Sequence, residues 1–175
     1  NYRCTREIWD AITQLAPDTE ESDRETLDVD VVYKGSGGNP YPLLFKYSRE
    51  DSVVKRLNNF LHEALILERV TPAASAVLCR TNKIAQKVAR LMDKKFNAKF
   101  MISKEVDLSH PGVKVLTMHA SKGLQFPVVA IVNVAEGVIP LFHKGGDSLE
   151  HYANEKRLFF VAASRAMRRL AVFAS

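Results

Sequence analysis

Hydrophobic residues recur along the chain with two spacings, one typical of helices and one typical of strands. Spacings of three and four residues predict helices at 5–15, about 50–69, 83–94 and 155–163. Short apolar or alternating runs predict strands at 29–33, 43–47, 76–79, 98–102, 113–118, 128–134 and 170–173. Because strands alternate with helices and some strands are apolar on both faces, the sequence predicts an α/β fold with a mainly parallel sheet.

Polar residues that can carry chemistry follow two of these strands directly. Arg80, Thr81 and Asn82 come after the strand at 76–79, and a polar turn follows the strand at 113–118. Ligands of parallel sheets bind at the carboxyl ends of the strands. We therefore expect the functional residues to gather along one rim of the sheet.

The polar turn after 113–118 concentrates hydroxyl, imidazole and ammonium groups before a glycine. Within six positions it holds Thr117, His119, Ser121 and Lys122. Gly123 permits a sharp bend or a close approach of the backbone. Such a turn is either a phosphate-binding loop or the capped start of a helix beside a sheet. These residues alone leave both interpretations open.

A second polar group follows the predicted helix at 155–163. Arg165 comes directly after this helix, and Arg168 and Arg169 stand close behind it. Basic residues at the end of a helix usually compensate its dipole, although a guanidinium also binds anions well. The helix by itself does not decide between these roles.

Composition narrows the class of protein. The 175 residues are 46% hydrophobic and 26% charged, which fits one globular domain and excludes a disordered chain, a collagen-like fibre and a coiled coil. The 25 Lys and Arg exceed the 20 Asp and Glu, and the net charge of +5 suits a polyanion such as nucleic acid without being specific to it.

The positions of the cysteines, of the histidines and of the apolar runs argue against a metal-binding, a disulfide-rich or a membrane-spanning protein. Cys4 and Cys79 form no CxxC pair, and the histidines show no ligand spacing, so we predict no metal site and no disulfide scaffold. No apolar run approaches the roughly 20 residues that span a bilayer, so no membrane partner is expected. Reduced cysteines are typical of the cytoplasm.

Five segments, taken together and in order, carry a family resemblance. They are NYRCT (1–5), VLCRTN (77–82), TMHASKGLQF (117–126), EGVIP (136–140) and EKRLFFVAASRA (155–166). The first resembles motif IV of the UvrD/Rep helicases of superfamily one, usually written QNYRS, and the second resembles the family's strand ending in Tyr-Arg-Thr/Ser-Asn. The third resembles motif V, the fourth the segment after it, and the fifth motif VI. The chain thus resembles the second RecA-like domain of these helicases.

Two departures from the family pattern stand out. Position 125 is Gln where the family usually has a Glu that meets the nucleotide ribose, and Gln can still bond a hydroxyl but carries no charge. Typical members also insert a large accessory domain where this chain has only a short connection at about 102–112. The chain therefore resembles a compact branch of the family, for which strong duplex unwinding is not assumed.

The resemblance implies a RecA-like three-layer α/β/α domain that spans residues 1–175 as the second, C-terminal domain of a longer chain. The P-loop pattern G-x-x-x-x-G-K-[ST] does not occur in the sequence, and in the family it belongs to the first RecA-like domain. We therefore expect the intact protein to use ATP and Mg²⁺. We expect the fragment alone to bind neither and to hydrolyse no ATP.

Site residues follow from the resemblance, position by position. As catalytic residues that reach the γ-phosphate it implies Arg3 and Arg165. At the nucleotide it implies Gln125, Lys122 and Gly123, with Lys122 placed near either the phosphates or the DNA. Along the single-strand path it implies Arg80, Asn82, Thr117 and His119, although turn and cap chemistry is an alternative for Asn82 and Thr117.

The function that the resemblance implies is the C-terminal motor domain of an ATP-dependent DNA helicase or translocase. Its expected partners are single-stranded DNA, on which the intact protein moves 3′ to 5′, and the first RecA-like domain of the same chain. Its expected place is the cytoplasm, at the nucleoid, in DNA repair or replication. The alternatives are a noncatalytic nucleic-acid-binding module and the helicase part of a nuclease-helicase, and the oligomeric state stays open.

Overall fold

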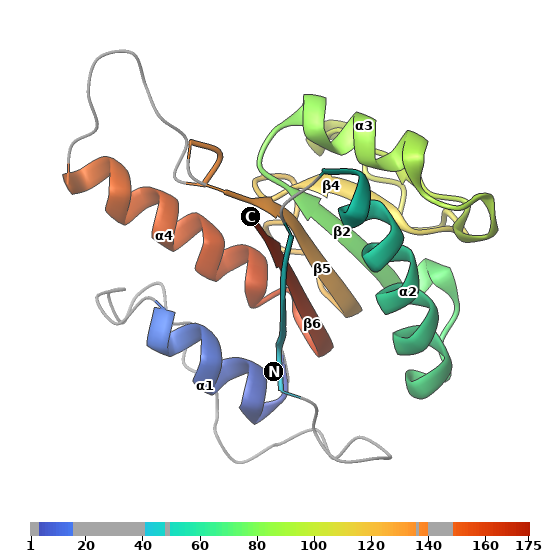
Figure 1. Ribbon diagram of the computed structural model, residues 1–175, viewed down its shortest axis with the longest axis horizontal. Helices are drawn as coiled ribbons and strands as arrows, with labels where there is room; N and C mark the ends of the chain where they lie inside the picture. The colour runs from blue at the N-terminus through green and yellow to red at the C-terminus, as the bar shows by residue number, and fades with distance from the viewer. Residues whose placement is uncertain (1–3, 16–40, 48–49, 136, 140–148) are drawn as a thin grey trace.

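A computed structural model describes residues 4–15, 41–47, 50–135, 137–139 and 149–175 (Figure 1). Its helices are α1 (Arg6–Leu15), α2 (Glu50–Glu68), α3 (Asn82–Leu91) and α4 (Leu149–Ala163). Its strands are β1 (Leu43–Lys46), β2 (Ser75–Cys79), β3 (Lys99–Phe100), β4 (Lys114–Thr117), β5 (Phe126–Val134) and β6 (Ala166–Ala174). Short 3₁₀ turns occupy Pro72–Ala74, Lys94–Phe96 and Ser103–Glu105.

The described strands form one sheet in the order β1-β6-β5-β2-β4-β3, and every paired strand runs parallel to its neighbour. This confirms the predicted parallel sheet. At one edge β2 and β4 end side by side, with Cys79 beside Thr117. At the other edge β5 and β6 begin side by side, with Phe126 beside Ala166. We call the end of the sheet at which the strands finish the carboxyl edge, and the opposite end, at which the strands begin, the amino edge.

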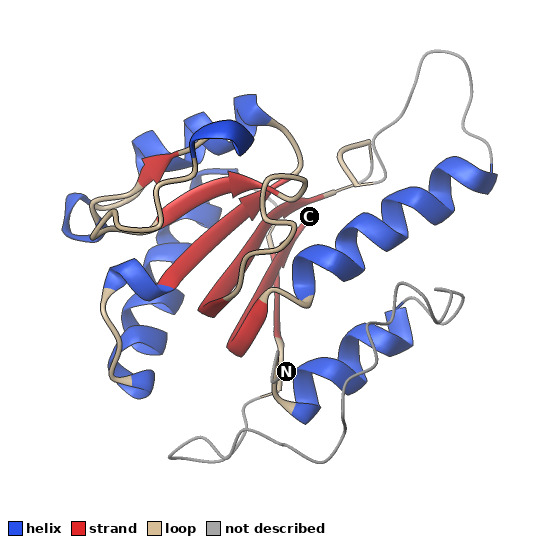
Figure 2. Cartoon of the chain, turned by 180° about the vertical axis from the view of Figure 1, so that it is seen from behind, coloured by secondary structure: helices blue, strands red, loops and turns tan. Residues whose placement is uncertain are grey.

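Helices cover both faces of the sheet and complete three layers. The pair α1 and α4 lies on one face and the pair α2 and α3 on the other (Figures 1 and 2). Strand β2 shows why the apolar runs are continuous: Ala76 and Leu78 join the core under α1 and α4, whereas Val77 and Cys79 join the opposite core. A strand covered on both faces needs apolar residues at every position. The three-layer α/β/α prediction is confirmed.

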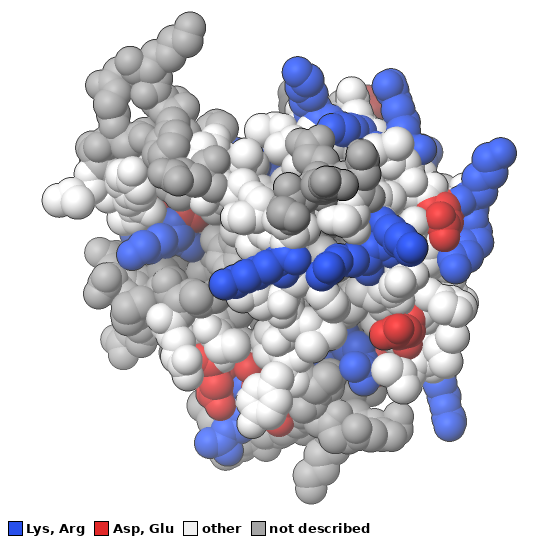
Figure 3. All heavy atoms as spheres, in the orientation of Figure 1, with Lys and Arg blue, Asp and Glu red and all other residues white. Residues whose placement is uncertain are grey.

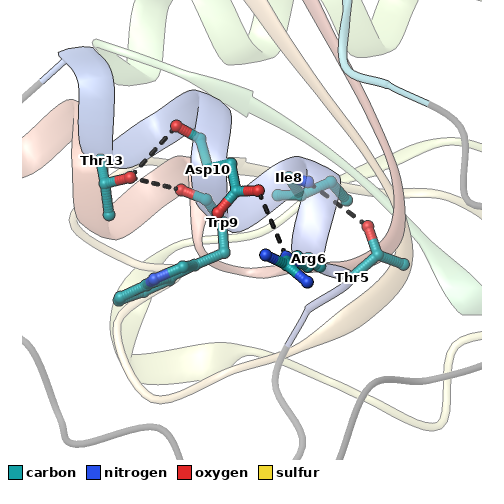
Figure 4. A network of polar contacts seen from close by, with 6 residues as sticks. All are labelled: Thr5, Arg6, Ile8, Trp9, Asp10 and Thr13. Atoms are coloured by element: carbon teal, nitrogen blue, oxygen red, sulfur yellow. Dashed lines mark hydrogen bonds and ion pairs between the residues drawn. The ribbon is translucent and has the colours of Figure 1, made fainter. Parts of the chain in front are cut away.

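Helix α1 begins at a cap and is held against α4. The hydroxyl of Thr5, which is buried, accepts a bond from the backbone N–H of Ile8 at 3.4 Å (Figure 4). The ring of Trp9 meets Phe160 of α4 edge-on, with centroids 5.7 Å apart. On the exposed side, Arg6 pairs with Asp10 at 3.6 Å, and the Thr13 hydroxyl donates to the backbone carbonyls of Trp9 and Asp10 (Figure 4).

Several expected element bounds differ from the observed ones. Helix α4 begins at Leu149, before the expected residue 155, and β3 is limited to Lys99–Phe100. Helix α3 ends at Leu91 because the next segment is tied to α2: the amide of the buried Asn58 donates to the Asp93 carboxylate at 2.9 Å and accepts from its backbone N–H at 3.4 Å. The strand expected at 29–33 lies outside the described residues.

The short connection before β4 closes tightly at Gly112. A Cβ atom at this position would overlap the backbone carbonyl of Asn97. We expect Gly112→Ala to destabilise the chain by about 3 kcal/mol, since the obstacle is backbone that cannot rotate away. Urea unfolding measures the change, with Ser103→Ala at an exposed position of the same connection as the control. Equal unfolding midpoints for the two variants would contradict the close approach.

Lys114 is a buried lysine at the start of β4. It is 1% exposed, and its ammonium group donates to the carbonyls of Ala73 at 2.6 Å and His110 at 2.8 Å. We expect Lys114→Met to cost about 2 kcal/mol because two carbonyls lose their donor. The same unfolding assay tests this against Lys99→Met, an exposed lysine on β3. A loss no larger than that of the control would show that the two bonds add nothing.

Candidate functional site

The predicted site residues lie at both edges of the sheet. Arg80 and Asn82 follow β2, Thr117 is the last residue of β4 and His119 follows it, so these four lie at the carboxyl edge. Arg165 precedes β6 and Gln125 precedes β5, which places both at the amino edge. The prediction that all of them share one rim was wrong. In a parallel sheet, residues just before a strand and residues just after one lie at opposite ends.

Arg80 is held by a helix at the carboxyl edge. Its Nε lies 2.9 Å from Oε2 of Glu155, and its Nη2 lies 2.7 Å from Oε1. The two side chains are only 13% and 7% exposed. The geometry is that of a bidentate arginine–carboxylate pair, which fixes both the position and the plane of the guanidinium.

Glu155 is a residue of this site to which the sequence analysis gave no role. The sequence did contain a signal. Helical spacing places Glu155 one turn before Leu158 and Phe159, on the side of α4 that packs against the core. A carboxylate on a buried face needs a basic partner. That partner, Arg80, lies 75 residues earlier in the chain, so patterns within a single helix or strand could not identify it.

His119 lies within electrostatic reach of this pair. Partial desolvation and the positive charge of Arg80 lower the pKa of His119, and the carboxylate of Glu155 opposes them. The ring is therefore neutral at pH 7 and offers one donor and one acceptor. Its side chain is exposed at the end of β4, where it can meet a ligand.

Cap chemistry accounts for part of the polar pattern at the carboxyl edge. The Thr117 hydroxyl accepts a bond from the backbone N–H of Ala120 at 3.1 Å, which is the cap alternative that the sequence left open. Thr81 caps α3 in the same way, accepting from Ile84 at 3.3 Å. Asn82, the first residue of α3, is exposed.

The turn between β4 and β5 is a series of hydrogen-bonded turns rather than the start of a helix. The Ser121 hydroxyl is buried and donates to the Met118 carbonyl at 2.7 Å. Gly123 has a φ of +85° with open space where a Cβ would lie, so glycine is favoured there by backbone conformation and not by crowding. Lys122 is exposed on this turn.

Arg165 is anchored at the amino edge. Its guanidinium donates to the carbonyl of Val161 at 2.9 Å, to the hydroxyl of Ser164 at 2.9 Å and to the carbonyl of Leu124 at 3.4 Å. The Arg165 carbonyl in turn accepts from the backbone N–H of Phe126 at 2.9 Å. These bonds join the end of α4 to the residues on either side of Gln125. Arg165 and Gln125, far apart in sequence, thus become neighbours.

The beginning of the chain also reaches this edge. Burial raises the pKa of the Cys4 thiol to about 11, and the positive charge of Arg165 opposes the shift, so Cys4 lies within electrostatic reach of Arg165. The thiol is therefore protonated at pH 7 and is no nucleophile. Arg3, the other predicted catalytic arginine, lies outside the described residues.

The described part of the chain offers neither a metal site nor a membrane-spanning helix. No three His, Cys, Asp or Glu side chains gather there as a candidate metal site. None of its helices is both long enough and apolar enough to cross a bilayer.

Residues 98–175 match the family of the UvrD-like helicase C-terminal domain. This match covers somewhat less than half of the chain. The matched range includes the turn at the carboxyl edge as well as α4 and Arg165. The resemblance drawn from the motifs is thereby confirmed.

Relatives of the domain are ATP-dependent DNA helicases. The chain is 41% identical over 58 residues to the ATP-dependent DNA helicase PcrA of Leuconostoc citreum, which is 33% of this chain and 8% of that protein. It is 40% identical over 58 residues to the ATP-dependent DNA helicase Rep of Escherichia coli K12, with the same two shares. The chain thus matches about a tenth or less of the length of these curated relatives.

A solved structure shares the fold. The crystal structure of the C-terminal domain of a possible DNA helicase from Lactobacillus plantarum WCFS1 superposes with a TM-score of 0.67 at 17% identity. The match covers 99% of this chain and 87% of the other. The likeness therefore extends over the whole domain, including the part before residue 98.

Proposed function

We propose that the chain is the C-terminal motor domain of an ATP-dependent DNA helicase or translocase that moves 3′ to 5′ on single strands when intact. The observation that carries the proposal is the anchoring of Arg165 beside Gln125 at the amino edge, through bonds to Val161, Ser164 and Leu124. A guanidinium held this firmly at an edge of the domain is suited to meet an anion presented by another domain.

The amino edge is the proposed nucleotide side. ATP and Mg²⁺ would be bound by the first RecA-like domain of the intact protein, which supplies the P-loop. Arg165, together with Arg3, would then reach the γ-phosphate, where charge develops on the transferring oxygens. Gln125 would bond the ribose, and Gly123 would belong to the same nucleotide site. Lys122 would lie near either the phosphates of the nucleotide or the DNA. Hydrolysis would then depend on closure of the two domains.

The carboxyl edge is the proposed path of single-stranded DNA. Arg80, Asn82, Thr117 and His119 carry groups that bond phosphate or sugar without reading sequence. Exposed Lys122 on the adjoining turn is a further candidate for a phosphate contact. Figure 3 shows Lys and Arg side chains across the middle and the upper right of one face, with Asp and Glu at its right and lower left. The net charge of +5 favours a polyanionic partner. In the cell this motor would act on DNA in the cytoplasm, in repair or replication.

ATP hydrolysis by the intact parent protein tests the proposal. Turnover is measured with and without a single-stranded oligonucleotide, and strand displacement on 3′-tailed and 5′-tailed duplexes gives the direction. We expect DNA-stimulated turnover in the parent protein and none in the isolated 175-residue chain. A parent protein that binds single strands but shows no stimulated turnover would overturn the motor proposal in favour of a noncatalytic nucleic-acid-binding module.

A further inference from the structure

The ion pair between Arg80 and Glu155 joins two elements that lead to different edges of the domain. Arg80 follows β2 at the carboxyl edge, and Glu155 belongs to α4. Both oxygens of the carboxylate are engaged by the guanidinium, at 2.7 and 2.9 Å, in a largely buried setting. A pair with two parallel bonds resists both sliding and rotation, so the helix cannot shift without moving Arg80.

Helix α4 runs from this pair to Arg165. From Glu155 to the last helical residue, Ala163, an α-helix rises about 12 Å. Along that stretch Phe160, Ala162 and Ala163 are buried, and Phe160 packs against Trp9 of α1. A helix buried along one side moves as one body, because close-packed protein interiors are only slightly compressible. A shift at one end of α4 therefore shifts its other end. Arg165 lies two residues after Ala163, with its Nε on the carbonyl of Val161 in the last turn of the helix.

We propose that Glu155 is a positioning residue that couples DNA at the carboxyl edge to Arg165 at the amino edge. The inference rests on the proposed function and deepens it. A DNA phosphate that approaches Arg80 competes with the Glu155 carboxylate for the same guanidinium donors. When the phosphate replaces the carboxylate, α4 loses its bonds to Arg80. The helix then shifts, and Arg165 at its far end shifts with it. Glu155 itself contacts neither ligand, since a carboxylate repels phosphate.

The test compares Glu155→Gln with Glu150→Gln in the intact parent protein. Glu150 is an exposed acidic residue in the first turn of the same helix, so its variant removes the same charge without breaking the pair. Two quantities are measured: the ratio of DNA-stimulated to DNA-free ATP turnover, and the Kd for a single-stranded oligonucleotide. We expect Glu155→Gln to lower the ratio about tenfold while the Kd stays equal or becomes tighter, because Arg80 keeps its charge. Glu150→Gln should leave both unchanged.

Each other outcome overturns the coupling role. An unchanged ratio in Glu155→Gln would show that the pair does not transmit the effect of DNA. A weakened Kd that accounts for the whole loss of stimulation would show that Glu155 only holds Arg80 on the DNA. A wild-type protein without DNA stimulation would instead refute the proposed function. If Glu155→Gln lowers the melting temperature too far for assay, Glu155→Asp replaces it, since the shorter side chain keeps its charge but withdraws the carboxylate from the two guanidinium bonds, and it should likewise lower the ratio without weakening the Kd.

Discussion

Replacement of Arg165 by alanine in the intact parent protein should lower single-strand-stimulated ATP turnover by about 10³-fold or more. An arginine that reaches a transferring phosphoryl group contributes a factor of roughly 10³–10⁵ in related nucleotide hydrolases. Arg165 has the firm anchoring that such a role requires, with Nε and Nη2 both held at 2.9 Å. Steady-state kcat with saturating oligonucleotide is the measurement.

Two further variants make the Arg165 result specific. Arg90→Ala removes an exposed arginine on α3 and should leave kcat within a factor of about two, as is usual for such surface changes. Arg165→Lys keeps the positive charge but loses the planar fork, so most of the loss should persist. Unfolding of the isolated chain separates a folding defect from a catalytic one. Robust stimulated turnover in Arg165→Ala would remove Arg165 from the catalytic site.

The layered fold could be predicted because the central strands need apolar residues on both faces of the sheet, and this requirement is visible in the sequence. The run at 76–79 contains no polar residue, and the structure divides Ala76 and Leu78 from Val77 and Cys79 between two cores. Such a run requires helices on both sides, which the alternation of elements supplies. Element ends were less predictable, because tertiary contacts set them. Asn58 on α2 reaches Asp93 and thereby fixes the segment after α3.

Family motifs imply which residues form the candidate site, but they do not give the arrangement of those residues in the sheet. The expectation that Arg80, His119 and Arg165 share one rim was wrong, because Arg165 precedes a strand whereas the other two follow strands. Glu155 was missed as a partner for a different reason. Helical spacing shows that its side chain faces the core, but its charge is satisfied by a residue from another part of the chain.

Removal of one member of the buried pair should be far more costly than removal of both. We expect Arg80→Met to destabilise the chain by about 3–5 kcal/mol, because Glu155 would keep its charge on a buried face without the guanidinium. Glu155→Met should fall in the same range for the complementary reason. The double variant should lose less than either single one, since well-packed apolar side chains of similar volume often replace a buried ion pair at little cost.

Urea unfolding of the four proteins, wild type included, gives the interaction energy as the departure from additivity. A surface pair tests the specificity of the cycle: Arg6 and Asp10 on α1 are 73% and 56% exposed at 3.6 Å, and replacing either should change stability by less than about 1 kcal/mol. Additive losses at Arg80 and Glu155 would mean that the two side chains act independently, and the bidentate geometry would then not hold α4. A double variant as stable as the wild type would show that the pair is retained for something other than stability. That is the expectation if it serves to couple the two edges.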